Sequence, residues 1–142
     1  MPSTQILVVD DFLPWQQFVL ELFEKEPNLN IICFAADGLG GVCRAQQLQP
    51  DVILMDVSLP VMDGLEAARK IRTLSPHSKI LFVSEHRSPD VIQAAFDIGA
   101  SGYVLKSDSN SDLIPGVRAA VRDQQFVSYS LKDWRKRSDS AD

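Results

Sequence analysis

Short apolar runs alternate with longer amphipathic segments along the chain. Five of these runs are rich in β-branched residues, and we expect strands over residues 6–9, 30–35, 52–55, 80–83 and 102–105. Four of the five are nearly continuous in their apolar character rather than alternating with polar residues. This pattern is typical of strands that are buried on both faces of a parallel sheet.

The segments between the runs carry apolar residues at helical spacing. In the first segment Trp15, Phe18, Val19, Leu22 and Phe23 fall at i, i+3, i+4, i+7 and i+8, which is one face of a helix. Four further faces follow, formed by Val42, Ala45 and Leu48, by Leu65, Ala68, Ile71 and Leu74, by Val91, Ile92, Ala95 and Phe96, and by Leu113, Val117, Ala120 and Val121. The alternation of five strands and five helices predicts a doubly wound α/β fold, with helices on both faces of a five-stranded parallel sheet.

Residues that start or stop helices agree with this reading. Asp63 precedes the third predicted helix as a cap, and Gly99 stands where the fourth would end in a left-handed conformation. Pro115 lies inside the fifth helical segment. Because proline is compatible only with the first turn of a helix, we expect this helix to begin near Ser111 with a distorted first turn.

The length of 142 residues is enough for one domain with its own core. We expect residues 1–127 to form this domain and residues 128–142 to form a linker-like or disordered tail. Basic residues surround Trp134 in the tail, so a contact with a partner or with nucleic acid is one interpretation. The start of a solvated linker is the simpler one.

Charge and cysteine content limit the class of protein. The chain has 14 basic and 19 acidic residues, a net charge of −5, which argues against non-specific binding to nucleic acid. The two cysteines, Cys33 and Cys43, make no disulfide framework, which favours a reducing compartment. The first residues lack the pattern of a signal peptide, and no apolar run is long enough to span a membrane. We therefore expect a cytoplasmic protein without membrane contact.

Ionisable and polar side chains stand at the ends of four predicted strands. Asp10 and Asp11 follow the first, Asp56 follows the third, Ser84 follows the fourth and Lys106 follows the fifth. Ligands in open parallel sheets bind beyond the carboxyl ends of the strands, so we expect these side chains to converge. Clustered carboxylates repel one another and attract a hard cation such as Mg²⁺. The lysine and the hydroxyl suit a phosphoryl group, which an aspartate can accept as an acyl phosphate.

Each of these residues has a plainer interpretation on its own. Asp10, Asp11 and Asp56 could be helix caps, because aspartate is favoured at helix N-termini. Lys106 could be a solvated lysine, and Tyr103 a packing residue in its strand. The shared position at the strand ends favours a site for all but Tyr103.

The motifs around these positions resemble the receiver domain of bacterial two-component response regulators. The resemblance covers residues 5–125 and rests on Val-Val-Asp-Asp at 8–11, Leu-Met-Asp-Val-Ser-Leu-Pro-Val-Met-Asp-Gly at 54–64, Val-Ser at 83–84 and Gly-Ala-Ser-Gly-Tyr-Val-Leu-Lys at 99–106. The segment at 84–86 and the fifth strand are most similar to the NarL/FixJ branch, whose members usually carry a C-terminal helix-turn-helix. The resemblance implies the flavodoxin-like receiver fold with strand order 2-1-3-4-5.

The resemblance also implies a chemical role for each matched residue at the strand ends. Asp56 would be the phosphoacceptor, and Lys106 would pair with the phosphoryl group. Asp11 and Asp56 would bind Mg²⁺ directly, and Asp10 would act mainly through water. The backbone carbonyl of Ser58 would complete the protein ligands of the metal.

Further positions would link the site to its surroundings. Ser84 and Tyr103 would be the switch residues: the hydroxyl moves towards the phosphoryl group and the ring turns inward behind it. Ser58 and His86 occupy the positions that tune self-dephosphorylation in this family. Glu85 stands where many receivers keep a small residue, and we expect it to screen or repel an incoming phosphodonor.

One further position departs from the family pattern. Ser107 stands where many receivers have a proline after the lysine, often with a cis bond. A cis bond without proline is costly, so we expect a trans peptide and a looser loop.

The partners follow from the same resemblance. A sensor histidine kinase or a phosphotransfer protein would supply the phosphoryl group, and the domain would catalyse its own phosphorylation and dephosphorylation without being an enzyme for other substrates. The modified state would act through the face formed by the fourth helix, fifth strand and fifth helix, and a homodimer through this face is one consequence. We expect the regulatory part of, or a relative of, a NarL/FixJ-type transcriptional regulator, without sequence-specific DNA binding by this chain.

Two other functions compete with this interpretation. A phosphatase of the haloacid dehalogenase type also uses aspartate and Mg²⁺. It needs an Asp-x-Asp motif after the first strand, whereas Asp10 and Asp11 are adjacent here. A degenerate receiver that works only through protein contacts is disfavoured by the full set of site residues.

Overall fold

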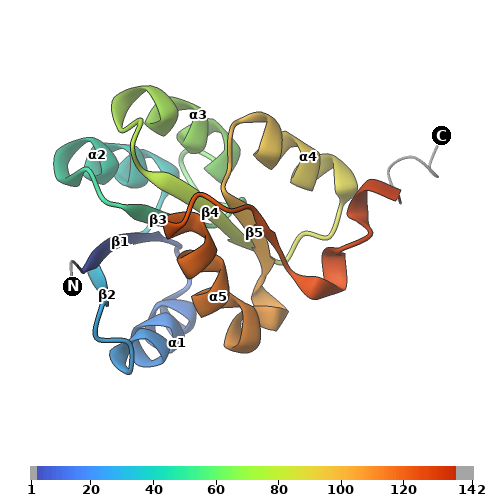
Figure 1. Cartoon of the computed structure of the whole chain (residues 1–142). Helices are drawn as coiled ribbons and strands as arrows, with labels where there is room; N and C mark the ends of the chain where they lie inside the picture. The colour runs from blue at the N-terminus through green and yellow to red at the C-terminus, as the bar shows by residue number, and fades with distance from the viewer. Residues whose placement is uncertain (1–2, 137–142) are drawn as a thin grey trace.

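The computed structural model describes residues 3–136, in which a parallel β-sheet lies between two layers of helices (Figure 1). The strands are β1 (Thr4–Val9), β2 (Leu29–Ala35), β3 (Val52–Met55), β4 (Lys79–Ser84), β5 (Gly102–Leu105) and β6 (Phe126–Val127). The helices are α1 (Leu13–Glu24), α2 (Gly38–Leu48), α3 (Gly64–Leu74), α4 (Pro89–Asp97) and α5 (Ser109–Val121), with short 3-10 helices η1 (Lys106–Asp108) and η2 (Tyr129–Leu131). Strands and helices alternate up to α5, as predicted.

The order of the strands in the described residues is β2-β1-β3-β4-β5-β6, and every neighbouring pair is parallel. The doubly wound sheet with order 2-1-3-4-5 is therefore confirmed, and β6 extends it by one short strand. Helices α2, α3 and α4 cover one face of the sheet, and α1 and α5 cover the other (Figure 1). The winding reverses between β1 and β3, which is where ligands bind in open α/β sheets.

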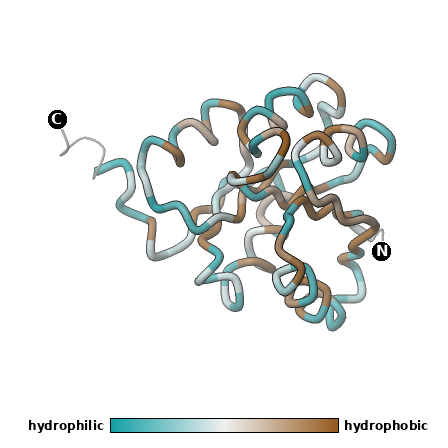
Figure 2. Tube along the Cα trace, turned by 180° about the vertical axis from the view of Figure 1, so that it is seen from behind, coloured by the Kyte–Doolittle hydropathy of each residue, from teal (hydrophilic) through white to brown (hydrophobic). Residues whose placement is uncertain are grey.

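The central strands contribute to a separate hydrophobic core on each face of the sheet. In β1, Leu7 and Val9 pack on the side of α2, α3 and α4, whereas Ile6 and Val8 pack on the side of α1 and α5. All four side chains are fully buried. Because helices cover both faces, the strand is apolar at consecutive positions, which explains the continuous runs in the sequence. Figure 2 shows these strands as hydrophobic stretches inside the molecule.

Two predicted helix boundaries are present as expected. The side chain of Asp63 accepts a hydrogen bond from the backbone N–H of Glu66 at 2.9 Å and caps α3. Gly99 follows the end of α4 with φ of 101°, a left-handed conformation that favours glycine. Asp63 is therefore a cap, as predicted.

The start of α5 differs from the prediction. The helix begins at Ser109 rather than near Ser111, and η1 leads directly into it. The chain after β5 is thus a 3-10 turn and not the looser loop expected at Ser107, although the peptide before Ser107 is trans as expected. The hydroxyl of Ser109 donates to the carbonyl oxygen of Leu105 at 3.3 Å, which ties this turn to β5. Pro115 lies inside the helix, where it removes one backbone donor.

Residues 126–136, which we call the C-terminal segment, run along β5 at the edge of the sheet. Strand β6 pairs with β5, and the backbone N–H of Ser128 donates to the carbonyl oxygen of Tyr103 at 3.0 Å. The hydroxyl oxygen of Ser128 accepts a hydrogen bond from the backbone N–H of Leu105 at 2.9 Å. The segment thereby holds two residues of the strand that leads to Lys106.

The described part of the predicted tail is packed rather than linker-like. Leu131 is fully buried, and Trp134 is 4% exposed and stacks on Phe96 of α4 with ring centroids 5.9 Å apart. The expectation of a linker-like or disordered tail is therefore wrong for residues 128–136, because their apolar side chains complete the core beside α4. Residues 137–142 lie outside the described residues.

Within the described part of the chain, no helix is long and apolar enough to cross a membrane.

Candidate functional site

Three aspartates meet at the carboxyl ends of β1 and β3. These strands are neighbours with Val9 opposite Met55, so the residues that follow them lie side by side. Asp10, Asp11 and Asp56 each place one carboxylate oxygen within 4.8 Å of the others. Asp10 and Asp56 are buried, whereas Asp11 is exposed. The predicted cluster of carboxylates is thus present, with one open side.

Lys106 reaches this cluster from the end of β5. Its Nζ donates a hydrogen bond to Oδ2 of Asp56 at 3.1 Å and lies 2.7 Å from Oδ2 of Asp10. The contact with Asp10 is an ion pair without hydrogen-bond geometry. Oδ2 of Asp10 is buried, and it receives no hydrogen bond from the described residues. The lysine therefore neutralises the cluster only in part.

Burial and neighbouring charges together shift the pKa of Asp56 and of Lys106. Burial is the largest effect on Asp56 and raises the pKa of its carboxyl, and the charge of Asp10 adds to this rise. The charge and hydrogen bond of Lys106 and the N–H of Ser58 act in the opposite direction without cancelling it. Burial lowers the pKa of the Lys106 ammonium, but its contacts with Asp10 and Asp56 outweigh burial and raise that pKa overall. Lys106 therefore stays charged beside the carboxylates.

The loop after β3 fixes the backbone of Asp56. Its Oδ1 accepts a hydrogen bond from the backbone N–H of Ser58 at 3.2 Å. The N–H of Gly64, at the start of α3, donates to the carbonyl oxygen of Val57 at 2.7 Å. A Cβ at Gly64 would lie 1.9 Å from the carbonyl oxygen of Asp56, so only glycine allows this close approach. The turn between β3 and α3 therefore clamps the carboxylate in place.

The residues expected to tune and to switch the site form one hydrogen-bonded group around His86. The side-chain Nε2 of His86 lies 2.7 Å from Oγ of Ser58. The backbone N–H of His86 donates to Oγ of Ser84 at 3.1 Å, and its carbonyl oxygen accepts from the hydroxyl of Tyr103 at 2.8 Å. The ring of Tyr103 is fully buried and points inward, and this burial raises the pKa of its hydroxyl.

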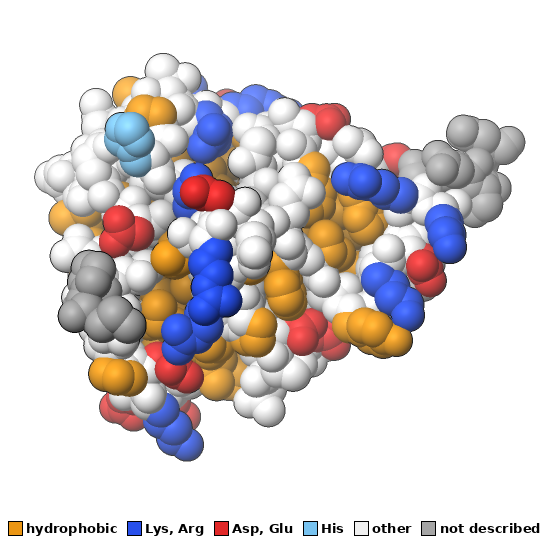
Figure 3. Space-filling model, viewed as in Figure 1, with side chains coloured by type: hydrophobic (Ala, Val, Ile, Leu, Met, Phe, Trp, Pro, Cys, Tyr) orange, Lys and Arg blue, Asp and Glu red, His pale blue; other side chains and the backbone are white. Residues whose placement is uncertain are grey.

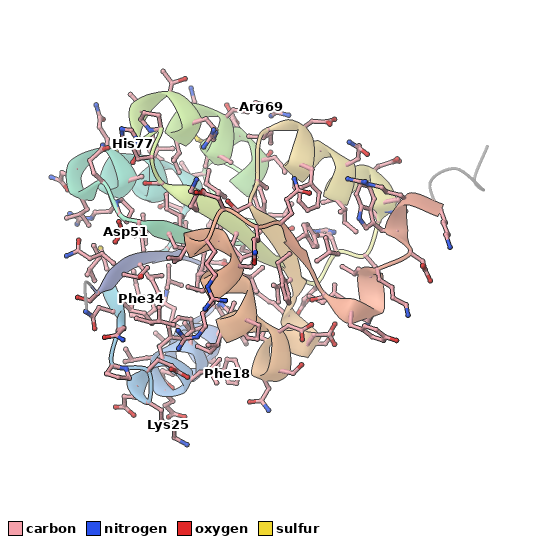
Figure 4. All side chains as sticks on the ribbon, in the orientation of Figure 1. Phe18, Lys25, Phe34, Asp51, Arg69 and His77 are labelled. Atoms are coloured by element: carbon pink, nitrogen blue, oxygen red, sulfur yellow. The ribbon has the colours of Figure 1, made fainter. Side chains whose placement is uncertain are left out.

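These side chains surround a pocket of about 320 Å³, which we call the acidic pocket. It is lined by Phe12, Asp56, Ser58, Ser84, Glu85, His86 and Lys106. Glu85 is exposed at the pocket, and its screening role stays a prediction. The second histidine, His77, lies just before β4, and Asp51 lies just before β3 (Figure 4). Both are at the amino ends of the strands, whereas the acidic pocket is at the carboxyl ends. The structure thus brings together every strand-end residue that the sequence singled out.

Two aromatic residues of the site were not recognised from the sequence. Phe12 is 59% exposed and lines the acidic pocket. The sequence pattern places Trp15 only on the apolar face of a helix, but Nζ of Lys106 lies 5.2 Å from the centre of its ring. A second hollow of about 540 Å³, next to the acidic pocket, is lined by both residues. The sequence signal was the short spacing from Asp11 to two aromatic residues at the start of a helix.

The chain is similar in sequence to larger bacterial proteins. It is 39% identical over 113 residues to a protein-glutamate methylesterase/protein-glutamine glutaminase of Colwellia psychrerythraea, covering 76% of this chain and 30% of that protein. It is 32% identical over 130 residues to the nitrate/nitrite response regulator protein NarL of Escherichia coli, covering 92% of this chain and 60% of that protein. The chain therefore spans less than two thirds of the length of either relative.

The fold also matches a solved structure along nearly its whole length. The crystal structure of a two-component response regulator of the LuxR family from Aurantimonas superposes with a TM-score of 0.91 at 28% identity. The match covers 97% of this chain and 99% of that chain. The C-terminal segment is thus within the compared region.

The fold and the site define a signalling domain of the α/β type, with an acidic pocket at the reversal point of the sheet. The chain belongs to the response regulator receiver domain family, whose model matches residues 6–118. It is close to the NarL and LuxR types of response regulator, and its function is phosphorylation-dependent two-component signalling.

Proposed function

We propose that Asp56 accepts the phosphoryl group. The observation that carries this proposal is the position of its carboxylate, which lies beside the carboxylates of Asp10 and Asp11 and accepts a hydrogen bond from the ammonium of Lys106. The acidic pocket opens directly onto this carboxylate. An aspartate in this setting has a counter-charge for the incoming group and a neighbouring place for a cation.

Mg²⁺ is the cation that the donor set fits. Hard carboxylate oxygens are the ligands that magnesium prefers, and an exposed Asp11 leaves room for the waters that it retains. Among the described residues, Oδ2 of Asp10 is buried with only its ion pair to Lys106, and burial raises the pKa of the Asp56 carboxyl more than Lys106 lowers it. Asp11 and Asp56 would bind the ion directly, Asp10 mainly through water, and the carbonyl of Ser58 would complete the protein ligands. When bound, the ion supplies charge neutralisation for the carboxylates and for the phosphoryl oxygens.

The transfer itself uses groups of this chain. An oxygen of the Asp56 carboxylate attacks phosphorus while the bond from phosphorus to the donor breaks, and the electron pair leaves with the donor. Lys106 leaves Asp56 and neutralises a phosphoryl oxygen, and the hydroxyl of Ser84 donates a hydrogen bond to another. Both groups line the acidic pocket together with Asp56.

The mouth of the pocket controls how long the acyl phosphate survives. Ser58 and His86 are joined across it by their hydrogen bond, so together they restrict the approach of water to Asp56. Glu85 adds a negative charge at the same mouth, which slows the approach of a negatively charged donor. The side chains of these three residues therefore tune rates without taking part in the transfer.

The signal leaves the site through the switch residues and β5. When the hydroxyl of Ser84 turns to the phosphoryl group, its hydrogen bond with the N–H of His86 is lost. The carbonyl of His86 is the acceptor for Tyr103, and Tyr103 is bonded to Ser128 of the C-terminal segment. Phosphorylation would thus shift an existing equilibrium at the face formed by α4, β5, α5 and the C-terminal segment.

This face has consequences for the predicted homodimer. Trp134 covers Phe96 of α4. A second copy of the chain would therefore have to dock beside the C-terminal segment, or the C-terminal segment would have to move first. Figure 3 shows basic side chains on the visible surface interspersed with acidic and hydrophobic ones. A mixed surface of this kind suits contacts with proteins. We propose no sequence-specific DNA binding by this chain, and no membrane partner.

The donor and the setting follow from the family. A sensor histidine kinase or a phosphotransfer protein would supply the phosphoryl group in the cytoplasm. A relative from Brevibacillus brevis that is 30% identical over 123 residues is named transcriptional regulatory protein DegU, so we propose that this chain is the regulatory part of a transcriptional regulator or a close relative of one. The methylesterase relative is matched over only 30% of its length, and we propose that this chain acts on no substrate other than its own Asp56.

The test is phosphorylation by a small-molecule donor. Acetyl phosphate with Mg²⁺ is expected to add one phosphoryl group to the wild type, measured by intact mass, and none to Asp56→Asn. Beryllofluoride with Mg²⁺ is expected to bind only the wild type. Equal behaviour of the two proteins would contradict the proposal.

A further inference from the structure

We propose that Trp15 is a positioning residue for Lys106, holding the ammonium by a cation–π contact while the phosphoryl group is transferred. This inference rests on the proposed function of Asp56. The observation behind it is the 5.2 Å distance between Nζ of Lys106 and the centre of the Trp15 ring. Tryptophan is the aromatic side chain that attracts a cation most strongly, and the attraction extends to about 6 Å from the ring centre.

The ring of Trp15 is held in place by burial and by a neighbouring residue of its own helix. Trp15 is the third residue of α1, follows Pro14 at the helix start, and is 8% exposed. Its ring stacks on Phe18 with centroids 5.3 Å apart. Phe18, labelled in Figure 4, comes from α1 on the face of the sheet that α5 also covers. The ring is therefore a fixed surface against which a flexible lysine can be held.

A neutral partner for Lys106 has a specific use in this reaction. In the resting site the ammonium is held by two carboxylates, Asp10 and Asp56. The proposed transfer weakens both contacts, because the Asp56 carboxylate becomes a mixed anhydride with phosphate and the oxygens of Asp10 and Asp56 would also hold the cation. The ring face attracts the ammonium without taking any of its three N–H donors. Trp15 can thus keep Lys106 in place while its donors pass from the carboxylates to the phosphoryl oxygens.

The competing explanation is that Trp15 only fills the core beside α1. The side chain does belong to that core, together with Val19 and Phe23. A purely packing role depends on volume and apolar area, which phenylalanine and leucine both supply. A cation–π role depends on the ring, which phenylalanine keeps in weaker form and leucine lacks. The pair of variants Trp15→Phe and Trp15→Leu therefore separates the two roles.

The first experiment measures the rate of phosphorylation by acetyl phosphate with saturating Mg²⁺ in four proteins. We expect Trp15→Phe to retain most of the rate and Trp15→Leu to lose roughly threefold or more. The matched control is Phe23→Leu, which removes a buried ring from the same helix without touching Lys106 and is expected to keep the wild-type rate. Equal rates for the Phe and Leu variants, or an equal loss in Phe23→Leu, would overturn the inference.

The second experiment asks whether the effect passes through Lys106. Trp134→Phe leaves Trp15 as the only tryptophan of the chain, so its fluorescence reports on the ring alone. Removing the ammonium with Lys106→Met in this background is expected to change the emission, and no change would contradict the contact. If the wild type is phosphorylated and the two Trp15 variants do not differ, only this inference fails. If the wild type is not phosphorylated at Asp56, the proposed function itself fails.

Discussion

Ser58 and His86 meet across the mouth of the acidic pocket, with Oγ of Ser58 2.7 Å from Nε2 of His86. Ser58 also donates its backbone N–H to Asp56, and the backbone of His86 binds both Ser84 and Tyr103. This hydrogen bond therefore connects the loop that carries Asp56 to the strand end that carries the switch. It links the two elements on which access to the site and readout of the site depend.

We predict that removing this hydrogen bond shortens the life of the phosphorylated protein. In Ser58→Ala the side chain of His86 is free and the pocket mouth opens to water. One lost hydrogen bond corresponds to roughly a twofold to tenfold faster decay. The decay is followed by intact mass after the phosphodonor is removed. Ser58→Thr keeps the hydroxyl and is the control, and a longer life in Ser58→Ala would contradict the interpretation of this contact as a closure.

We predict that Lys106→Met slows phosphorylation but binds Mg²⁺ more tightly than the wild type. The ammonium lies 2.7 Å from Asp10 and 3.1 Å from Asp56, so it competes electrostatically with a cation at the same oxygens. Isothermal titration with Mg²⁺ measures the affinity, and acetyl phosphate measures the rate. Weaker Mg²⁺ binding in the variant would show that the lysine does not compete with the ion.

The same variant is expected to be less stable without Mg²⁺, by about 3 kcal/mol, because it leaves buried carboxylates without their counter-charge. The pKa of Lys106 is raised in the folded protein, so its contribution to stability is present below the pKa of an unfolded lysine. That contribution is lost as the pH rises through the folded-state pKa. Added Mg²⁺ is expected to restore part of the free energy of unfolding.

Asp56→Asn is predicted to raise the free energy of unfolding at neutral pH in the absence of Mg²⁺. Burial raises the pKa of the Asp56 carboxyl, so the folded protein favours the protonated form and loses stability as the pH rises through that pKa. Asparagine carries no charge and does not show this loss. Thermal unfolding from pH 4 to 7 should show the gap between variant and wild type widening with pH. A gap that narrows with rising pH would be the opposite of this expectation.

Trp134→Ala is expected to destabilise the domain by about 3 kcal/mol, because a buried ring on Phe96 is replaced by a cavity. Urea unfolding measures the loss. The control is Asp133→Ala, one residue earlier and exposed, which is expected to change stability by less than about 0.5 kcal/mol. Equal values for the two variants would mean that the C-terminal segment contributes little to the fold.

Trp134 also provides a test of the path from the site to the C-terminal segment. In Trp15→Phe it is the only tryptophan, and it lies on the segment bonded to Tyr103 and Leu105 through Ser128. Beryllofluoride with Mg²⁺ is expected to change its emission as the packing on α4 shifts. The same addition to the protein that also carries Asp56→Asn should have no effect. An unchanged emission in both proteins would place the output of the domain elsewhere.

Much of the fold and of the site was predictable from the sequence. The continuous apolar runs predicted strands buried on both sides, as Ile6 and Leu7 are, and the alternation with helical segments predicted the winding of the sheet. The winding places the carboxyl ends of all parallel strands at one side of the sheet. The proximity of Asp10, Asp56 and Lys106 was therefore predictable from the sequence alone. The boundary of α5 was missed because proline at position 115 is tolerated inside the helix.

The sequence alone determined which residues stand at the strand ends, because strand periodicity and chain direction are local properties. Only the tertiary structure decided what lies over those residues from other parts of the chain. Trp15 faces Lys106 and Trp134 covers Phe96 because helix orientation and packing bring distant segments into contact. The sequence pattern placed Trp15 on the face of a helix and Trp134 in a tail, but it did not indicate which residues they contact. Their contacts depend on the packing of helices against a twisted sheet, which no local pattern encodes.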